Sequence, residues 1–342
     1  MKIAVVGVTG VVGETILRVL DERAVDVDEL GAFASRDRSE ALEWRGRSWP
    51  IRAATPVALR EGAFDAVFFA SSEDASAELA EHAIAGGAVV IDNSSAFRMT
   101  PGVPLIVPEV NAHHLRAEHR IFPVANCTAI VLCVGLAAIA RTAGLVSVRV
   151  ATYQAVSGAG KAGLTALAGE EAAAFAAHDD TAPPQSPFVR PIFRNVVPQI
   201  GAFDAHGDSE EEKKVALETR KMLDLPLLHI AATTVRVPVR YAHSEAVFIE
   251  TERDTNATEL GEALARADGV VFHPAGVVSP LEVEGQDRVH VARLRAEGES
   301  TRHFQLWIVG DQTRKGAATN AVQILALLVE RGFVGREKVG SP

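Results

Sequence analysis

The sequence contains only two cysteines and lacks long apolar runs. Cys127 and Cys133 are six positions apart, the second inside a helical pattern, so they do not form a disulfide framework, and no spacing typical of a metal site accompanies them. No apolar stretch approaches the roughly 18 to 20 residues that span a bilayer. The opening MKIAVVGVTG has no long apolar core or cleavage site of a signal peptide. We therefore expect no metal, no membrane association and a reducing, cytoplasmic setting.

Positive charges are outnumbered, with 34 Lys and Arg against 44 Asp and Glu. The formal net charge is −10 and no basic stripe appears, so we expect no nucleic-acid partner. The GxSxG turn of a serine hydrolase is missing too. A chain of 342 residues is too long for one ordinary core, and this length predicts two domains.

The first part of the chain alternates strands with helices. Apolar runs predict strands at 2–8, 29–34, 64–71 and 88–95, and helical spacing predicts helices at 10–23 and 73–87. Strands separated by helices form a parallel sheet with right-handed crossovers. This part is therefore expected to be an α/β domain of the Rossmann type.

Near residue 145 the pattern changes. Segments 146–158, 232–252 and 288–311 alternate like strands with one solvated face, while 158–178 and 209–223 are helical. Residues 179–209, rich in Pro, Ser and Asp, predict an irregular excursion, and 315–333 predict an apolar helix. The second part is expected to be an α+β domain with a mixed or antiparallel sheet.

Glycines recur every third residue after the first strand, at Gly7, Gly10 and Gly13. Glycine lets a backbone turn sharply and approach a pyrophosphate, whose charge meets N–H groups at the start of a helix. The spacing is GxxGxxG, one residue away from the commoner GxGxxG. The pattern favours a dinucleotide site, and a merely tight strand–helix turn is the alternative.

The end of the second strand bears on the choice between NAD and NADP. An NAD site needs a carboxylate there for the ribose 2′-hydroxyl. Instead the strand runs into Ser35, Arg36, Asp37, Arg38 and Ser39, and two arginines with two serines suit a 2′-phosphate better. NADP is favoured, although Asp37 keeps NAD open and a solvated charged loop is a third interpretation.

Cys127 stands where a loop turns into an apolar helix, in VANCTAI. Cysteine is often simply a small buried residue. A thiol at a helix N-terminus, however, lies at the positive end of the helix dipole, which favours the thiolate and makes a nucleophile. The window alone leaves both interpretations open, whereas Cys133 is expected to be a core residue.

Three charged residues could bind anions or substrate. Arg98 follows a strand at the carboxyl edge of the sheet. Its guanidinium could bind phosphate or carboxylate there, and the alternative is a solvent-exposed arginine in a loop. Glu211 and Lys214 stand at i and i+3 in a charged helix start and could point the same way into a cleft. Most charges of that helix are expected to form a solvated face.

Two further residues lie in or beside strand-like alternation. Burying the charge of Arg236 in a strand costs free energy unless an oppositely charged group pairs with it, and a bound carboxylate would be such a group. His243 titrates near neutrality and could move a proton, although any one of eleven histidines is more often structural. Gln154, before a glycine-rich turn, says little by itself.

Taken together, these motifs resemble the aspartate-semialdehyde dehydrogenases. The matching segments cover nearly the whole chain, in the order GVTGVVG, SSAFRM, ANCTAI, QAVSGAGKAG, NVVPQI, an ExxK pair before ETRKML, VRVPVRYAHSEAV and GDQTRKGAATNAVQI. The resemblance implies a Rossmann-type NADP domain (1–127 and 314–342) and an α+β catalytic and dimerisation domain (128–313). It implies a homodimer, or a tetramer, and NADPH-dependent reductive dephosphorylation of aspartyl phosphate to aspartate semialdehyde and phosphate, in lysine, threonine and methionine biosynthesis.

The resemblance also implies roles for single residues. Cys127 matches the nucleophile, His243 the acid–base residue and Gln154 the residue that orients the intermediate. Phosphate contacts are implied at Arg98, Asn126 and Lys214, and contacts to the substrate's carboxylate and amino group at Arg236 and Glu211. Cofactor contacts are expected at Gly7, Thr9, Gly10, Val11, Val12, Gly13, Ser35, Arg36, Arg38, Ser39, Ser71, Ser157, Gly158 and Asn320.

The sequence departs from the family at two places, and two other functions compete. Ala125 stands where Pro is frequent, and Ala242 where Gly is frequent, which bears on local loop geometry rather than on chemistry. N-acetyl-γ-glutamyl-phosphate reductases perform the same chemistry on an acylated substrate, but Arg236 and Glu211 favour a free amino acid, because an ammonium needs a carboxylate partner. A non-catalytic dimeric relative would lack the nucleophile or the base, and both are present.

Overall fold

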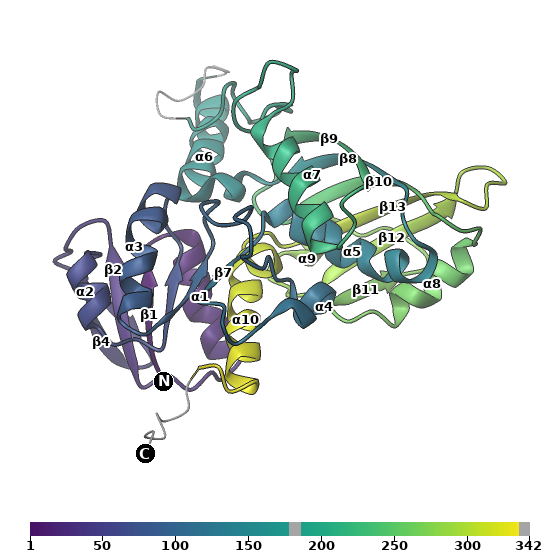
Figure 1. Ribbon diagram of the computed structural model, residues 1–342. Helices are drawn as coiled ribbons and strands as arrows, with labels where there is room; N and C mark the ends of the chain where they lie inside the picture. The colour runs from purple at the N-terminus through teal and green to yellow at the C-terminus, as the bar shows by residue number, and fades with distance from the viewer. Residues whose placement is uncertain (178–185, 335–342) are drawn as a thin grey trace. The chain divides into compact units, whose positions relative to one another are not determined.

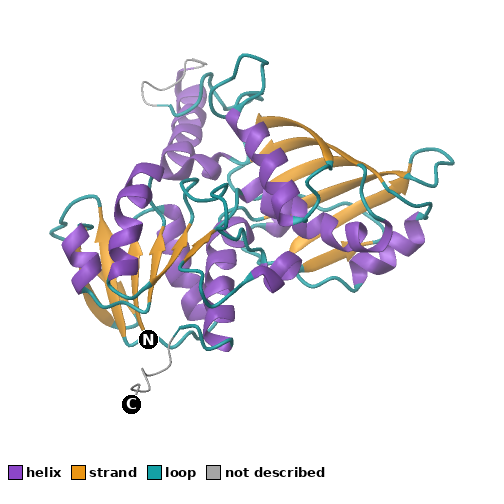
Figure 2. Ribbon diagram, in the orientation of Figure 1, coloured by secondary structure: helices purple, strands orange, loops and turns teal. Residues whose placement is uncertain are grey.

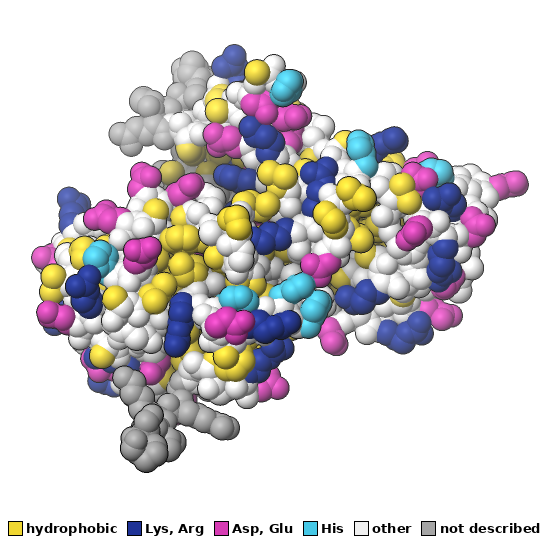
Figure 3. Space-filling view, viewed as in Figure 1, with side chains coloured by type: hydrophobic (Ala, Val, Ile, Leu, Met, Phe, Trp, Pro, Cys, Tyr) yellow, Lys and Arg dark blue, Asp and Glu magenta, His cyan; other side chains and the backbone are white. Residues whose placement is uncertain are grey.

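The computed structural model describes residues 1–177 and 186–334. These residues separate into two compact units, Met1–Ala125 with Ala317–Pro342, and Asn126–Gly316 (Figure 1). The irregular excursion expected over 179–209 and the C-terminal end of the first domain, expected to reach 342, lie in part outside the described residues. Lys and Arg side chains are interspersed with Asp and Glu side chains on the face shown in Figure 3.

The first unit contains a seven-stranded sheet. Its strands are β1 (Lys2–Val6), β2 (Glu29–Ala34), β3 (Ala41–Trp44), β4 (Arg47–Ala53), β5 (Ala66–Phe69), β6 (Val89–Asp92) and β7 (Ile121–Pro123). They lie in the order β3-β4-β2-β1-β5-β6-β7, and every pair except β3–β4 is parallel. The predicted parallel sheet is therefore confirmed.

Helices cover both faces of this sheet (Figure 1). They are α1 (Val11–Glu22), α2 (Pro56–Glu61), α3 (Glu73–Ala85), α4 (Pro108–Asn111), the 3₁₀ turn η1 (Ala112–His114) and α10 (Thr319–Glu330). Helices α2 and α3 pack on one face, where Leu59 and Leu79 meet Val6 and Phe69 of the strands in a buried apolar cluster. Helix α10 returns from the far end of the sequence to pack beside α1 on the other face.

The sequence patterns did not predict the β3–β4 hairpin or α2. Strand β4 carries Pro50, which cannot donate to a sheet ladder and is typical of edge strands or loops. Here Pro50 is opposite Ala41 of β3, the edge strand of the sheet. Helix α2 is only six residues long, with Thr55 as N-cap and Pro56 at its first position, too short for a periodic signal.

The second unit contains a six-stranded mixed sheet (Figure 2). Its strands are β8 (Ser147–Gln154), β9 (His229–Arg236), β10 (His243–Glu250), β11 (Val270–His273), β12 (Val289–Ala296) and β13 (His303–Gly310). The order is β11-β12-β13-β10-β8-β9, with parallel pairs only at the two edges. The expected mixed sheet is confirmed.

One face of the second sheet is covered by helices. The helices of this unit are α5 (Cys127–Ala143), the 3₁₀ turn η2 (Val156–Ala159), α6 (Gly160–Ala177), α7 (Glu210–Met222), α8 (Ala257–Ala265) and α9 (Pro280–Val283). Helix α5 is buried along nearly its whole length between the sheet and helices α7 and α8. Because side chains alternate along a strand, Gln154, Arg236, His243 and Glu245 all point to this covered face.

The expected C-terminal helix differs at its start. Residues Arg314–Ala318 form a π-helical turn (η3), and regular α-helix begins only at Thr319. π-helical turns are rare in proteins, but those that occur are often found at functional sites. Over the described residues, no helix combines the length and apolarity needed to cross a membrane.

Candidate active site

Cys127 is the first residue of α5, and Asn126 caps that helix. Asn126 Oδ1 accepts a hydrogen bond from the Ala129 N–H at 3.1 Å, the usual reason for Asn at an N-cap. The Cys127 side chain is partly exposed, whereas Cys133 is buried and burial strongly raises its pKa. The thiol of Cys127 therefore meets the requirement for a nucleophile at a helix N-terminus, and Cys133 does not.

His243 lies against this thiol. Its Nε2 is 3.5 Å from Cys127 Sγ, although the two residues are 116 positions apart in the chain. His243 is the first residue of β10 and is fully buried. Burial lowers its pKa well below the ordinary value, and the nearby Arg236 guanidinium lowers it further. A neutral imidazole beside a thiol is a pair that can support nucleophilic catalysis.

Arg236 ends β9 and carries a buried positive charge. Its Nη1 donates to the Ala155 carbonyl at 2.7 Å. Burial lowers the pKa of Arg236, while the negative charges of Glu211 and of the Cys127 thiolate oppose that effect. A Cβ added at Gly158 would lie 2.6 Å from Nη1, so a side chain there would require the guanidinium to shift.

Glu211 gathers three side chains of the site. Its Oε1 accepts from Asn126 Nδ2 and from Gln154 Nε2, both at 3.0 Å, and from Thr128 Oγ1 at 3.4 Å. The other amide atom of Gln154, Oε1, accepts from Thr152 at 3.0 Å. Hydrogen bonds to a carboxylate are the stronger kind, so Glu211 fixes the amides of Asn126 and Gln154 beside the thiol.

The two positively charged residues among those assigned to phosphate belong to different units. Lys214 lies three residues after Glu211 on α7, on the same side of that helix, and is partly exposed. Arg98 belongs to the first unit and is buried. Its Nε and Nη2 donate to the carbonyls of Val124 and Asn93, both at 2.9 Å.

The glycine-rich turn has the geometry that a pyrophosphate requires. Gly7 has φ +88°, and a side chain there would collide with the Ala70 carbonyl; a side chain at Gly13 would collide with the Gly7 carbonyl. Gly10 is the N-cap of α1 and offers no side chain to the first turn. Helix geometry leaves the N–H groups of Val11, Val12 and Gly13 without intrahelical acceptors. The turn, which also contains Thr9, therefore fits a bound dinucleotide phosphate.

The loop after β2 exposes the residues expected at the cofactor's ribose. Ser35, Arg36, Arg38 and Ser39 are all exposed. Asp37, which kept NAD open, accepts the Ala53 N–H with its Oδ1 at 2.7 Å. The Asp37 carboxylate is therefore hydrogen-bonded to the last residue of β4, and Arg36 and Arg38 are the exposed charged groups that a ligand could contact.

Three other expected cofactor residues differ in their surroundings. Ser71, just after β5, has a buried hydroxyl with no hydrogen-bond partner among the described residues, which suits a ligand contact. Asn320 is buried in the first unit, where its Nδ2 donates to the Ile106 carbonyl at 3.0 Å. Ser157, in the second unit, donates to the Arg240 carbonyl and accepts from Gln312, so its hydroxyl is used by the protein.

The structure adds residues that the sequence patterns did not indicate. Glu218 accepts the Asn126 N–H at 2.5 Å and so holds the backbone just before the thiol. Gln312 accepts the Ala242 N–H at 2.9 Å and fixes the entry to His243, where Ala242 has φ +65°. The close approach of Gly316, in η3, to Cys127 leaves no room for a side chain. Glu218 lay in the quoted segment ETRKML, and Gln312 and Gly316 lay in GDQTRKGAATNAVQI, but nothing in these motifs distinguished them.

Family models match both units. A model described as "Semialdehyde dehydrogenase, NAD binding domain" matches residues 2–118, and one described as "Semialdehyde dehydrogenase, dimerisation domain" matches residues 136–315. Between them they cover most of the chain.

Individual proteins match over nearly the full length. The chain is 39% identical over 340 residues to aspartate-semialdehyde dehydrogenase of Aquifex aeolicus, covering 97% of this chain and 99% of that protein. It is 39% identical to aspartate-semialdehyde dehydrogenase 2 of Vibrio cholerae, with 97% and 98% covered. Crystal structures of aspartate semialdehyde dehydrogenase II from Vibrio cholerae, one complexed with ASA, superpose with a TM-score of 0.91 at 36% identity, covering 96% of this chain and 98% of that one.

Proposed function

The chain belongs to the aspartate-semialdehyde dehydrogenases, a family of phosphorylating oxidoreductases, and on that premise we propose how its residues perform the reaction. The substrate pair is aspartyl phosphate and aspartate semialdehyde, joined through a thioester on Cys127. The observation that carries this proposal is the 3.5 Å contact between Cys127 Sγ and His243 Nε2 at the start of α5. A covalent thioester divides one difficult step into two easier ones.

We assign the chemistry to three side chains. The Cys127 thiolate attacks the acyl carbon, where the C–S bond forms and the bond to phosphate breaks, its electron pair leaving with the phosphate oxygen. His243 exchanges a proton at Nε2, a role typically worth about 10² to 10⁴ in rate. Gln154, fixed by Glu211 and Thr152, orients the acyl group beside the sulfur.

The substrate's ionic groups find partners on α7 and β9. Arg236 is buried and positively charged, and a carboxylate is the partner that its fork fits. Glu211 is the acidic residue whose charge acts most strongly on Arg236, and its carboxylate suits a free ammonium. An N-acetylated glutamyl substrate has no ammonium, so this pair favours the aspartyl one. We assign phosphate to Lys214, Arg98 and Asn126.

We assign the cofactor to the first unit and prefer NADP to NAD. The glycine turn, the buried Ser71 hydroxyl and the exposed Arg36 and Arg38 support this, as does the engagement of Asp37 by Ala53. The cofactor supplies the hydride. The remaining assignments, Ser35, Ser39, Ser157, Gly158 and Asn320, rest on the family resemblance. In this proposal the first unit binds the cofactor and the second carries catalysis and dimerisation.

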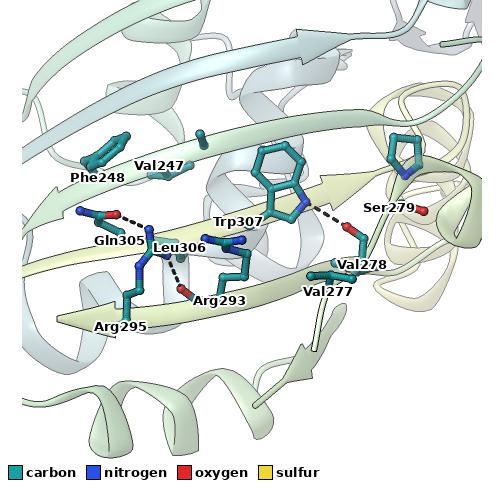
Figure 4. Close-up of a pocket in the computed structure, with 12 residues that line it drawn as sticks. Val247, Phe248, Val277, Val278, Ser279, Arg293, Arg295, Gln305, Leu306 and Trp307 are labelled. Carbon is teal, nitrogen blue, oxygen red and sulfur yellow. Dashed lines mark hydrogen bonds between the residues drawn. The ribbon is translucent and has the colours of Figure 1, made fainter. Parts of the chain in front are cut away.

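We propose a homodimer formed through the second sheet. Its face opposite α5 bears exposed aromatic side chains, Tyr153 and Phe248, each 40% exposed. A pocket of about 410 Å³ opens there (Figure 4), with Phe248 beside Gln305 and with Trp307 donating through its Nε1 to the Val278 carbonyl at 3.0 Å. Contiguous exposed apolar surface of this kind typically marks an interface. A tetramer of two such dimers stays a prediction from the resemblance.

We keep the prediction of a reducing, cytoplasmic setting. Neither cysteine forms a disulfide, and a nucleophilic thiolate would be lost to oxidation in an oxidising compartment.

The deciding experiment is phosphate-dependent reduction of NADP⁺ by the purified protein. Aspartate semialdehyde and N-acetylglutamate semialdehyde are offered in parallel, with and without phosphate, and NADPH absorbance is followed. We expect turnover of the first only, abolished without phosphate. Turnover of the second would keep the mechanism and overturn the assignments of Arg236 and Glu211. Absence of turnover with both would favour the non-catalytic dimer.

A further inference from the structure

The two ring nitrogens of His243 have neighbours of different kinds. Nε2 faces Cys127 Sγ at 3.5 Å, and Nδ1 accepts the backbone N–H of Ala155 at 3.1 Å. A backbone N–H group can only donate. Nδ1 must therefore present its lone pair, and a proton on that nitrogen would point at another proton.

This arrangement selects one form of the ring. A neutral imidazole carries one proton, and with Nδ1 unprotonated that proton is on Nε2. Imidazolium carries protons on both nitrogens and could not accept from Ala155. The Nε2–H group then points at the sulfur, so the histidine donates a hydrogen bond to Cys127.

The surroundings of the ring favour the same form. The position that a Cβ would take at Gly158 is 2.6 Å from Arg236 Nη1 and 3.4 Å from His243 Cε1, so the guanidinium and the imidazole flank one glycine. Burial lowers the pKa of His243, and repulsion by the positive charge of Arg236 lowers it further. Glu211, on α7, interacts with the charge of Arg236.

Another acid on this face of the sheet is Glu245, two residues along β10 from His243. Its carboxyl is fully buried, neither oxygen has a hydrogen-bond partner among the described residues, and burial raises its pKa well above the usual range. The protonated form of Glu245 is therefore favoured, and this residue does not supply the negative charge that an imidazolium would need.

We propose, on the basis of the function assigned above, that resting His243 is a neutral Nε2–H donor to the Cys127 sulfur, with its tautomer fixed by the Ala155 amide. Arg236, not an imidazolium, is then the positive charge that faces the Cys127 thiolate. Ala155 acts as a positioning residue through its backbone. Before His243 can take up a proton, the Ala155 contact has to open, so acid–base exchange is coupled to movement of the turn after β8.

The tautomer can be measured directly by ¹⁵N NMR of the full-length protein labelled at histidine. The His243 signals are assigned by their loss in His243→Gln. From about pH 6 to 9, across the range in which an ordinary histidine titrates, we expect a protonated Nε2 and an unprotonated Nδ1. Protons on both nitrogens, or on Nδ1 alone, would overturn the proposal.

The residue that supplies the positive charge beside the Cys127 thiolate is identified from the rate at which iodoacetamide alkylates Cys127. Cys133 is fully buried, and Cys127→Ser gives the background rate. At pH 7 we expect His243→Gln, which keeps a donor, to change the rate by less than about threefold, and Arg236→Gln to lower it by about tenfold or more, equivalent to one pKa unit. The reverse order would show a thiolate–imidazolium pair and refute the proposal.

Neither measurement requires turnover. A wild-type protein inactive with both semialdehydes would reject the function while leaving the tautomer measurable. An active protein with imidazolium at His243 would keep the function and reject this inference. Circular dichroism of each variant identifies any loss of fold, and the NMR spectrum of the wild type decides the tautomer even then.

Discussion

Replacing Gly158 with alanine should weaken substrate binding. The substitution removes no charged group, but it displaces the guanidinium of Arg236. The added methyl group would lie 2.6 Å from Arg236 Nη1, and real Cβ contacts are essentially never shorter than 3.0 Å. The guanidinium has to shift, and its 2.7 Å hydrogen bond to the Ala155 carbonyl is lost or distorted. The proposed carboxylate site is then displaced.

The expected magnitude follows from the hydrogen bond of the same charged kind that Arg236 is proposed to make to the substrate carboxylate. A hydrogen bond with a charged donor contributes about 1.5 to 3 kcal/mol, and 1.4 kcal/mol corresponds to a factor of ten. If Arg236 binds the substrate carboxylate, KM for aspartate semialdehyde should rise by about 10- to 100-fold. The rate at saturation should change less, because Cys127 and His243 stay in place.

Steady-state kinetics with aspartate semialdehyde and NADP⁺ varied in turn test this expectation. Gly160→Ala is the matched control, because nothing lies within 4 Å of the added methyl although φ is +66°. That control should cost about 1 to 3 kcal/mol of stability, because φ +66° with ψ −154° is a conformation that essentially only glycine adopts, and it should leave KM unchanged. An unchanged KM for the semialdehyde in Gly158→Ala would refute the reasoning. A rise confined to NADP⁺ would instead assign the glycine to the cofactor.

Three other variants test separate parts of the structure. Cys127→Ala should abolish turnover, followed by NADPH absorbance, while NADP⁺ binding measured by calorimetry persists; full activity would remove the thioester. Arg36→Ala with Arg38→Ala should lower the preference for NADP⁺ over NAD⁺ in kcat/KM, and an unchanged ratio would place the 2′-phosphate elsewhere. Glu245→Gln should stabilise the protein increasingly as pH rises, because a carboxyl whose pKa is raised in the folded state contributes stability at low pH that is lost as pH rises toward that pKa. A difference in Tm between variant and wild type that does not change from about pH 5 to 8 would contradict this last expectation.

The fold could be predicted to the extent that elements repeat a period. Strands 29–34 and the helices beginning at Val11 and Glu73 follow apolar spacing closely, and the structure places them there. Strand β1 ends at Val6, before the predicted end, because Gly7 turns with a positive φ. The β3–β4 hairpin was missed, since Pro50 and short exposed strands give no clear alternation.

The site could be predicted only where a side chain has a recognisable chemistry. Cys127 has a local signal, a thiol before an apolar helix, but nothing in the sequence joins it to His243 across 116 residues. That pairing came from resemblance to a family. The Ala155 N–H has no signal at all, because every residue except proline carries one and only the folded chain selects which amide meets an imidazole.

The chain crosses between the two units at Ala125–Asn126 and again at Gly316–Ala317. Cys127 comes one residue after the first crossing, and Gly316, at the second, approaches Cys127 so closely that no side chain fits between them. The second unit therefore begins and ends beside its nucleophile. Both of its connections to the first unit leave from residues next to the start of α5, so the backbone that holds the sulfur is fixed from both ends of the unit.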